Sequence, residues 1–196
     1  MTRSSKNFVD FPQGIGEKLF DALLGDASWE KTLHAFHVER NQLHIAVMAE
    51  PYLLACMEGK KTIESRFSSR RIPPYGQVKS GDVILMKQPG GPIVGVCEVS
   101  DAWFYRLDPE AWKMIKVEYL RDIYADNQFW VEREDASYAT LIRIKNVRSL
   151  KPFAFAKRDR RGWVILKPDR RHVSSKELKR TRQRRSKEHI EQTLSP

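Results

Sequence analysis

The chain has 196 residues, of which 41% are hydrophobic and 31% charged, and its 35 Lys and Arg against 25 Asp and Glu give a formal net charge of +10. This length supports one main domain with a real core, and the hydrophobic fraction excludes a disordered protein. The charge is uneven, because residues 157–196 hold 14 basic and 5 acidic residues whereas residues 1–156 are almost balanced. The excess of positive charge predicts an anionic partner.

The sequence contains no run of about 18 apolar residues and no apolar N-terminal stretch that could serve as a secretory signal. Cys56 and Cys97 lie far apart without a CxxC or other ligand spacing, which favours reduced, buried thiols over a disulfide. We therefore expect a cytoplasmic protein without a membrane anchor, a metal or a cofactor.

Two short helices are predicted at the start of the chain. Apolar residues with helical spacing run from Ile15 to Leu24 and stop at Gly25, a residue that favours helix ends. A second helix follows with Trp29 on its apolar face, and Asp26 or Ser28 is expected to cap it. We predict that residues 1–42 form an N-terminal helical extension that packs on the rest of the molecule.

From residue 43 onward the pattern is that of short strands and connectors. A helix is expected after Pro51 and a hairpin turn at the Gly90 and Gly91 pair. The predicted strands are residues 43–49, 60–66, 82–87, 93–99, 138–147, 151–157 and 162–166. The last two flank the sequence RDRRG and are expected to pair as a second hairpin.

Helices interrupt these strands and decide the predicted architecture. Asp108 and Pro109 begin a helix whose apolar residues continue with helical spacing to Ile123, and a further helical turn is expected around 128–134. Along most of the chain the connections are too short for parallel crossover units, so we predict an α+β fold: a small, mostly antiparallel β-barrel with flanking helices. Residues 169–196 are expected to form a basic, flexible C-terminal arm.

One motif in this sequence resembles a known family. After the helix at residues 52–58 the pattern G-x-K-x-x-E-x-R is filled by Gly59, Lys61, Glu64 and Arg66, and a V-x-x-GD turn follows in VKSGDVILMK. The sequence thereby resembles the ASCH domain, a branch of the PUA-like superfamily of small β-barrels associated with RNA. The resemblance extends roughly from Leu43 to Lys167 in the order of elements and is specific mainly over residues 51–100, and we predict an ASCH-like domain at residues 43–168. The resemblance implies a PUA-like barrel and a function in RNA or single-stranded nucleic-acid binding.

The residue types of the motif suggest two roles. Glu64 and Arg66 share one face of an extended strand, whereas Lys61 joins them only if the chain bends. A carboxylate held beside a cation accepts and donates hydrogen bonds, which can distinguish one nucleobase from another. The alternative is a structural ion pair that closes the mouth of the barrel.

The surroundings of the motif are basic and contain aromatic residues. Between residues 60 and 79 the only acid is Glu64. The candidate nucleic-acid-binding residues are Lys60, Lys61, Glu64, Arg66, Arg70, Arg71, Tyr75, Lys79 and Trp130. The cations suit phosphate oxygens, and Tyr75 could stack on a base. The alternative for this stretch is a solvated loop without a ligand.

The resemblance also implies a catalytic alternative. Some small ASCH proteins are amidohydrolases that act on N4-acetylcytidine with a Lys, a Thr three residues later and a distant Glu. Here Lys61 matches the Lys, Glu64 stands at the Thr position and Glu118 is a candidate for the distant acid. A carboxylate is a poor replacement for a hydroxyl nucleophile. A nuclease and a protein-interaction module are the remaining alternatives.

Overall fold

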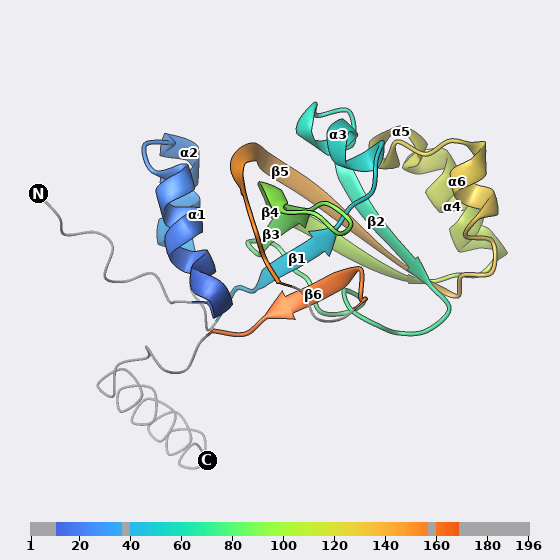
Figure 1. Ribbon diagram of the computed structural model, residues 1–196. Coiled ribbons are helices and arrows are strands. Elements are labelled where there is room, and N and C mark those ends of the chain that lie inside the picture. The colour runs from blue at the N-terminus through green and yellow to red at the C-terminus, as the bar shows by residue number, and fades with distance from the viewer. Residues whose placement is uncertain (1–10, 37–39, 157–159, 169–196) are drawn as a thin grey trace, which may run out of the picture.

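The computed structural model describes residues 11–36, 40–156 and 160–168 (Figure 1). The helices are α1 Ile15–Leu23, α2 Ala27–Ala35, α3 Tyr52–Met57, α4 Pro109–Glu118, α5 Leu120–Ile123 and α6 Asn127–Val131, and a 3-10 turn spans Pro12–Gly14. The strands are β1 Leu43–Val47, β2 Ile63–Ser68, β3 Val83–Lys87, β4 Ile93–Arg106, β5 Tyr138–Phe153 and β6 Trp163–Leu166.

All six strands belong to one sheet, in the order β2-β5-β4-β3-β1-β6. The pair β1 and β3 is parallel and every other pair is antiparallel. The long pair β4 and β5 contains three register shifts, and such irregularities bend a sheet. The sheet therefore curls into a half-barrel whose edge strands, β2 and β6, are not paired with each other. The predicted α+β class and mostly antiparallel sheet are confirmed.

The second predicted hairpin is wrong. Strand β6 pairs with β1, with Trp163 opposite Ala46, and it does not pair with the segment that precedes RDRRG. Residues 151–153 belong instead to β5, where Phe153 lies opposite Ile93 of β4. The strands expected at 138–147 and 151–157 are thus largely one long strand of 16 residues. Local turn signals predict pairing between sequence neighbours, whereas the pairing of β6 with β1 joins distant segments and leaves no local pattern.

Buried side chains form one cluster on one face of the sheet and two on the other. The first, on what we call the inner face, joins β1, β3, β4, β5 and β6 and includes Cys56 and Cys97. The opposite, outer face packs on α1 and α2 over one half and on the segment of α4, α5 and α6 over the other. Figure 1 shows these two helical groups at opposite ends of the sheet. Helices therefore cover the outer face, and the inner face is enclosed by the curled sheet together with α3.

The N-terminal helices are part of this core. Trp29 is wholly buried, and its indole nitrogen donates a 2.9 Å hydrogen bond to the carbonyl of Asn146 in β5. Asp26 caps α2 by accepting from the backbone N–H groups of Ser28 and Trp29, and its carboxylate pairs with Arg148 at 2.6 Å. This ion pair also lowers the pKa of Asp26. The helices are thus fixed to β5 by an apolar and a charged contact.

Two further sequence predictions can be compared with the structure. The helix capped by Asp108 starts as predicted, but it breaks at Tyr119 and continues as the separate short helix α5. Cys56 and Cys97 are both buried, as expected, and neither forms a disulfide in the part of the chain that the structure describes. Among the described residues, no helix has the length and apolar character needed to cross a membrane.

Candidate functional site

The G-x-K-x-x-E-x-R motif begins where α3 ends. Gly59 adopts a positive φ of 71°, a conformation that glycine tolerates best, and turns the chain back toward the sheet. The backbone N–H of Lys61 then donates to the carbonyl of Ala55, and regular β2 structure starts only at Ile63. Because Lys61 precedes the strand, strand alternation does not fix its direction. This is the bend that a site shared by Lys61 and Glu64 requires.

Glu64 lies between two cations on the inner face. Its Oε1 is 2.7 Å from Nε of Arg66, and its Oε2 is 3.5 Å from Nζ of Lys61. The Lys61 ammonium also donates a 2.8 Å hydrogen bond to the carbonyl of Ile123. Lys61 is 2% and Glu64 5% exposed. The structure therefore brings the three motif residues, which we call the motif cluster, into contact in a nearly dry environment.

Arg66 links the two free edges of the half-barrel. From β2 its Nη2 donates to the carbonyl of Val47 at 2.9 Å, and its Nη1 donates to the carbonyl of Gly162 at 3.3 Å. The guanidinium also lies 5.2 Å from the centre of the Trp163 ring in β6. These contacts span the gap between edge strands that share no backbone hydrogen bond. The alternative role foreseen for the motif, an ion pair that closes the barrel mouth, is thus supported by geometry.

A buried polar chain continues from Trp163 and was missed by the sequence analysis. The Trp163 indole donates to Nδ1 of His44 at 3.1 Å, and Nε2 of His44 is 3.1 Å from Oδ2 of Asp82. Asp82 also accepts the backbone N–H groups of Gln42 and Lys79. Since Nδ1 accepts from the indole, the proton of neutral His44 is assigned to Nε2. The available signal was a lone histidine within the apolar strand β1.

The Glu64 carboxylate also acts on the thiol behind it. Burial raises the pKa of Cys56 to about 12, and the negative charge of Glu64 adds to this shift. Burial likewise raises the pKa of Cys97 well above its ordinary value, with smaller contributions from Cys56 and Glu64. The two thiols therefore remain protonated at neutral pH and act as apolar core groups.

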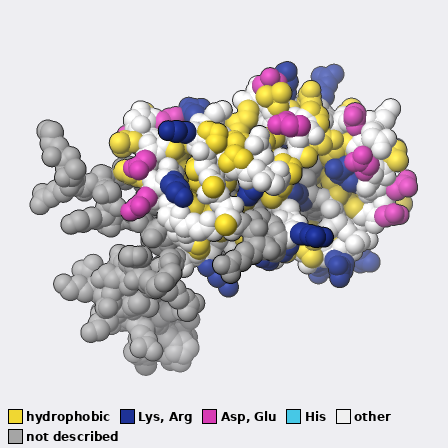
Figure 2. All heavy atoms as spheres, in the orientation of Figure 1, with side chains coloured by type: hydrophobic (Ala, Val, Ile, Leu, Met, Phe, Trp, Pro, Cys, Tyr) yellow, Lys and Arg dark blue, Asp and Glu magenta, His cyan; other side chains and the backbone are white. Residues whose placement is uncertain are grey.

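The basic segment, which we define as residues 65–81, contains no Asp or Glu and connects β2 to β3. Arg70, Arg71 and Lys79 are exposed. The Arg71 guanidinium lies 5.8 Å from the ring centre of Tyr75 and 5.3 Å from that of Tyr138. Figure 2 shows Lys and Arg side chains along the lower edge of the molecule, where this segment runs in Figure 1. Cations and aromatic rings thus share one surface.

The remaining candidates lie apart from the motif cluster or have other partners. Lys60 is exposed and pairs with Glu58 at 2.7 Å. Trp130 is only 7% exposed, because it packs against Phe129 and other rings of the outer-face cluster. Its ring therefore belongs to the core, and Trp130 also borders a hollow of about 460 Å³ beside α4 and α6.

The structure does not bring together the residues that the amidohydrolase alternative requires. Glu118 is exposed at the end of α4, and within the described part of the chain it forms no ion pair with Lys61. The hydroxyl of Thr62, the nearest candidate nucleophile in sequence, donates to Asp122 at 2.7 Å. The geometry consequently gives no support to amide hydrolysis by these groups.

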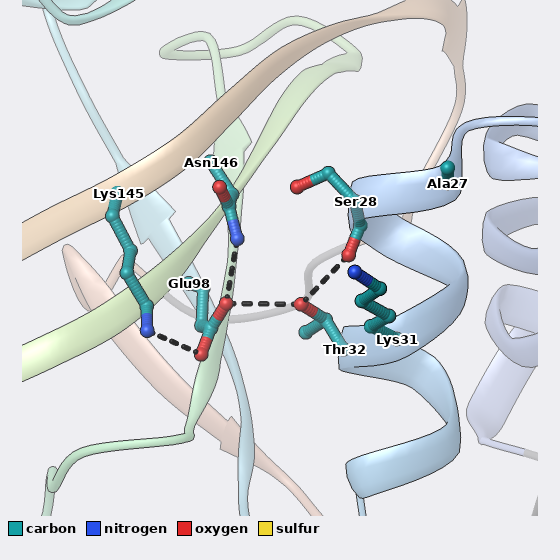
Figure 3. Close-up of a pocket in the computed structure, with 7 residues that line it drawn as sticks. All are labelled: Ala27, Ser28, Lys31, Thr32, Glu98, Lys145 and Asn146. Carbon is teal, nitrogen blue, oxygen red and sulfur yellow. Dashed lines mark hydrogen bonds and ion pairs between the residues drawn. The ribbon is translucent and has the colours of Figure 1, made fainter.

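A hollow of about 510 Å³ lies between α2 and the strands β4 and β5 (Figure 3). At its base Glu98 accepts hydrogen bonds from Thr32 and Asn146, and it pairs with Lys145 at 3.0 Å. These contacts hold α2 to the sheet, so Glu98, Thr32, Asn146 and Lys145 already have partners. In residues 11–36, 40–156 and 160–168 no group of three or more His, Cys, Asp or Glu could hold a metal ion.

No protein-family model and no curated protein matches the chain. Its structure is similar to those of two single-substitution variants of ZmASCH from Zymomonas mobilis, with a TM-score of 0.50 and 17% identity over 70% of this chain and 94% and 96% of theirs. A further structure of ASCH from Zymomonas mobilis gives a TM-score of 0.45 and 19% identity, over 56% of this chain and 71% of the other. At these identities the likeness concerns architecture. The described chain has the α+β fold seen in these ASCH structures.

Proposed function

We propose that this protein binds RNA or another single-stranded nucleic acid. In this proposal the exposed cations Arg70, Arg71 and Lys79 contact phosphates, and the motif cluster recognises a base. The C-terminal arm, residues 169–196, lies outside the described residues and is proposed to add sequence-independent attraction. Such attraction comes from the release of counterions when cations meet phosphates.

The observation that carries the proposal is the composition of the basic segment. Three exposed cations lie on it without any acid, and Arg71 lies against the half-buried ring of Tyr75. A protein surface that combines cations with accessible rings can hold the phosphate and the base of an unpaired nucleotide together. A merely solvated loop would not need the guanidinium of Arg71 beside aromatic rings.

Base recognition is assigned to the Glu64 carboxylate. A carboxylate has about four acceptor positions, and Arg66 and Lys61 use two of those on Glu64. The remaining positions suit a donor such as the exocyclic amine of a base. Access to Glu64 passes Arg66, which is half-buried, so an entering base would replace the contacts of Arg66 with Val47 and Gly162.

The phosphate contacts are tested by measuring RNA affinity as a function of salt. Replacing Arg70, Arg71 and Lys79 by Ala should weaken binding and lower the slope of log K against log salt by about 2, since each single-strand phosphate contact contributes about 0.7. The matched control replaces Lys31, Lys113 and Arg121, three exposed cations elsewhere, and removes the same charge. Equal loss in both variants would overturn the assignment to the basic segment.

Base recognition is tested with Glu64→Gln, which keeps the shape of the side chain and removes its charge. We expect the variant to change the order of affinities across a set of single-stranded oligonucleotides that differ at one base. Identical affinity for every oligonucleotide, in both wild type and variant, would remove the recognition role of Glu64. Absence of binding to RNA and DNA at low salt would overturn the proposed function as a whole.

A further inference from the structure

Three aromatic rings meet beside the motif cluster at the end of the inner face where β2, β5 and β4 lie together. Tyr75 comes from the basic segment, Phe104 from β4 and Tyr138 from β5, and we call them the Tyr75 platform. The ring centre of Tyr75 lies 5.6 Å from that of Phe104 and 5.2 Å from that of Tyr138, in edge-to-face geometry. Such geometry is favourable for aromatic pairs and fixes the rings relative to one another.

The platform is open to solvent on one side. Phe104 is 38% exposed, although its β4 neighbours Trp103 and Tyr105 pack against the outer-face cluster. The side chains of adjacent strand residues point to opposite faces, so Phe104 points to the inner face. Phe104 thus combines a ring contact with Tyr75 and an accessible apolar surface, which is available to a ligand.

Positive charge surrounds these rings. The Arg71 guanidinium lies against Tyr75 and Tyr138, and exposed Arg106 stands opposite Tyr138 in the register of β4 and β5. Arg70 precedes Arg71 in the same acid-free segment and is exposed. An apolar partner such as a lipid or an apolar peptide does not need this charge. The combination of rings and cations instead suits a base whose phosphate is held nearby.

Sheet register fixes the distance between the platform and the motif cluster. Thr140 of β5 lies between Arg66 of β2 on one side and Phe104 of β4 on the other. Neighbouring strands are about 4.8 Å apart, so Arg66 and Phe104 are separated by about 10 Å across the sheet. This separation exceeds the width of one pyrimidine ring, and both side chains lie on the same face. Two bases are therefore needed for one to lie at each position.

We propose that the Tyr75 platform is a second base-binding site, which stacks the nucleotide adjacent to the one recognised at Glu64. The inference rests on the proposed function and specifies its ligand: a run of at least two unpaired nucleotides, and neither a free nucleoside nor a duplex. Bases in a duplex are stacked on each other and do not expose the faces that the platform requires.

The experiment compares Phe104→Leu, which keeps an apolar side chain without a ring face, with the control Phe104→Tyr, which keeps the ring. The probes are a short single-stranded RNA, a duplex of the same sequence and a mononucleotide. We expect Phe104→Leu to bind the single strand about tenfold or more weakly, in line with the loss of one stacked base. Phe104→Tyr should bind like wild type, and mononucleotide binding should be equal in all three proteins.

A second measurement uses wild-type protein alone, so it does not depend on the folding of a variant. RNA that carries 2-aminopurine at successive positions should show fluorescence quenching at the position that stacks on the platform. If wild type binds RNA but no position is quenched, the platform is overturned and the proposed function stands. The same conclusion follows if Phe104→Leu binds the single strand as tightly as wild type. Equal affinity for duplex and single strand also overturns the platform. If wild type binds no nucleic acid, both proposals fail.

Discussion

Arg66 and Val47 belong to strands that share no backbone hydrogen bond, yet Nη2 of Arg66 donates to the Val47 carbonyl at 2.9 Å. The same guanidinium reaches the carbonyl of Gly162, just before β6, and the carboxylate of Glu64. One side chain thus replaces the row of backbone hydrogen bonds that would close a complete barrel. Closure by a side chain can be opened at lower cost than closure by a strand pair, and movement of Arg66 would expose the buried Glu64.

Arg66→Ala should destabilise the fold because it removes the link between the edges and leaves Glu64 with Lys61 as its only cation. We expect a loss of about 2 to 4 kcal/mol in the free energy of unfolding. This loss is somewhat smaller than the loss for breaking a fully buried ion pair, because Arg66 is only half-buried. Arg66→Lys keeps the charge but not the fork that contacts two carbonyls, and should recover only part of the loss. Urea unfolding measures the stability of both variants. If Arg66→Ala is as stable as wild type, Arg66 does not close the barrel.

Lys61 and Glu64 form a buried ion pair in which each charge is compensated by the other. Glu64→Leu alone leaves the Lys61 ammonium buried without its carboxylate, and we expect a loss of about 3 to 5 kcal/mol. Adding Lys61→Met removes the uncompensated charge, so the double variant should be more stable than Glu64→Leu. A double-mutant cycle followed by urea unfolding gives the coupling energy. Strictly additive losses would show that the pair does not interact.

Cys56 should react very slowly in the folded protein. With its pKa raised to about 12, roughly one thiol in 10⁴ is ionised at pH 8, against about one in ten at the ordinary value of 9.0. Alkylation by iodoacetamide should therefore follow the unfolded fraction in a urea series. Rapid alkylation of Cys56 without denaturant would contradict this.

The same raised pKa predicts how stability depends on pH. Unfolded Cys56 loses its proton above about pH 9, whereas the folded thiol keeps it up to about pH 12. The unfolded state therefore binds fewer protons in this range, so the free energy of unfolding falls as pH rises from 9 to 12. Replacing Cys56 by Ala should flatten this decline, which urea unfolding at several pH values measures. An equally steep decline in the Ala variant would assign it to other groups.

Removal of residues 1–36 should abolish cooperative folding. Helices α1 and α2 cover buried residues of β1 and β3, and the deletion exposes the apolar outer face, including Leu43 and Val83. Circular dichroism and thermal unfolding of the shortened chain should show no cooperative transition. The control lacks residues 1–10, which removes no described contact. A cooperative transition of the shortened chain would show that the helices are dispensable for the fold.

The sequence by itself determined the local elements of this protein. Alternating and helical apolar spacing located most strands and helices, and Asp26 or Ser28 and Asp108 were expected at helix starts. The motif placed Glu64 and Arg66 on one face of a strand, whereas the contact of Lys61 with Glu64 depended on a bend. These features depend on interactions between residues close in the chain. For the same reason the sequence could not decide whether the motif recognises a base or closes the barrel.

Only the tertiary structure decided which residues distant in sequence contact each other. The pairing of β6 with β1, the path of Arg66 to Val47, the chain from Trp163 through His44 to Asp82, and the meeting of Tyr75 with Phe104 all connect residues far apart in sequence. Such contacts arise because burial of the two sheet faces selects one arrangement of the whole chain, and no local pattern encodes that choice. The acid-free segment was visible in the sequence, but its aromatic partners, Phe104 and Tyr138, became its neighbours only through the curl of the sheet.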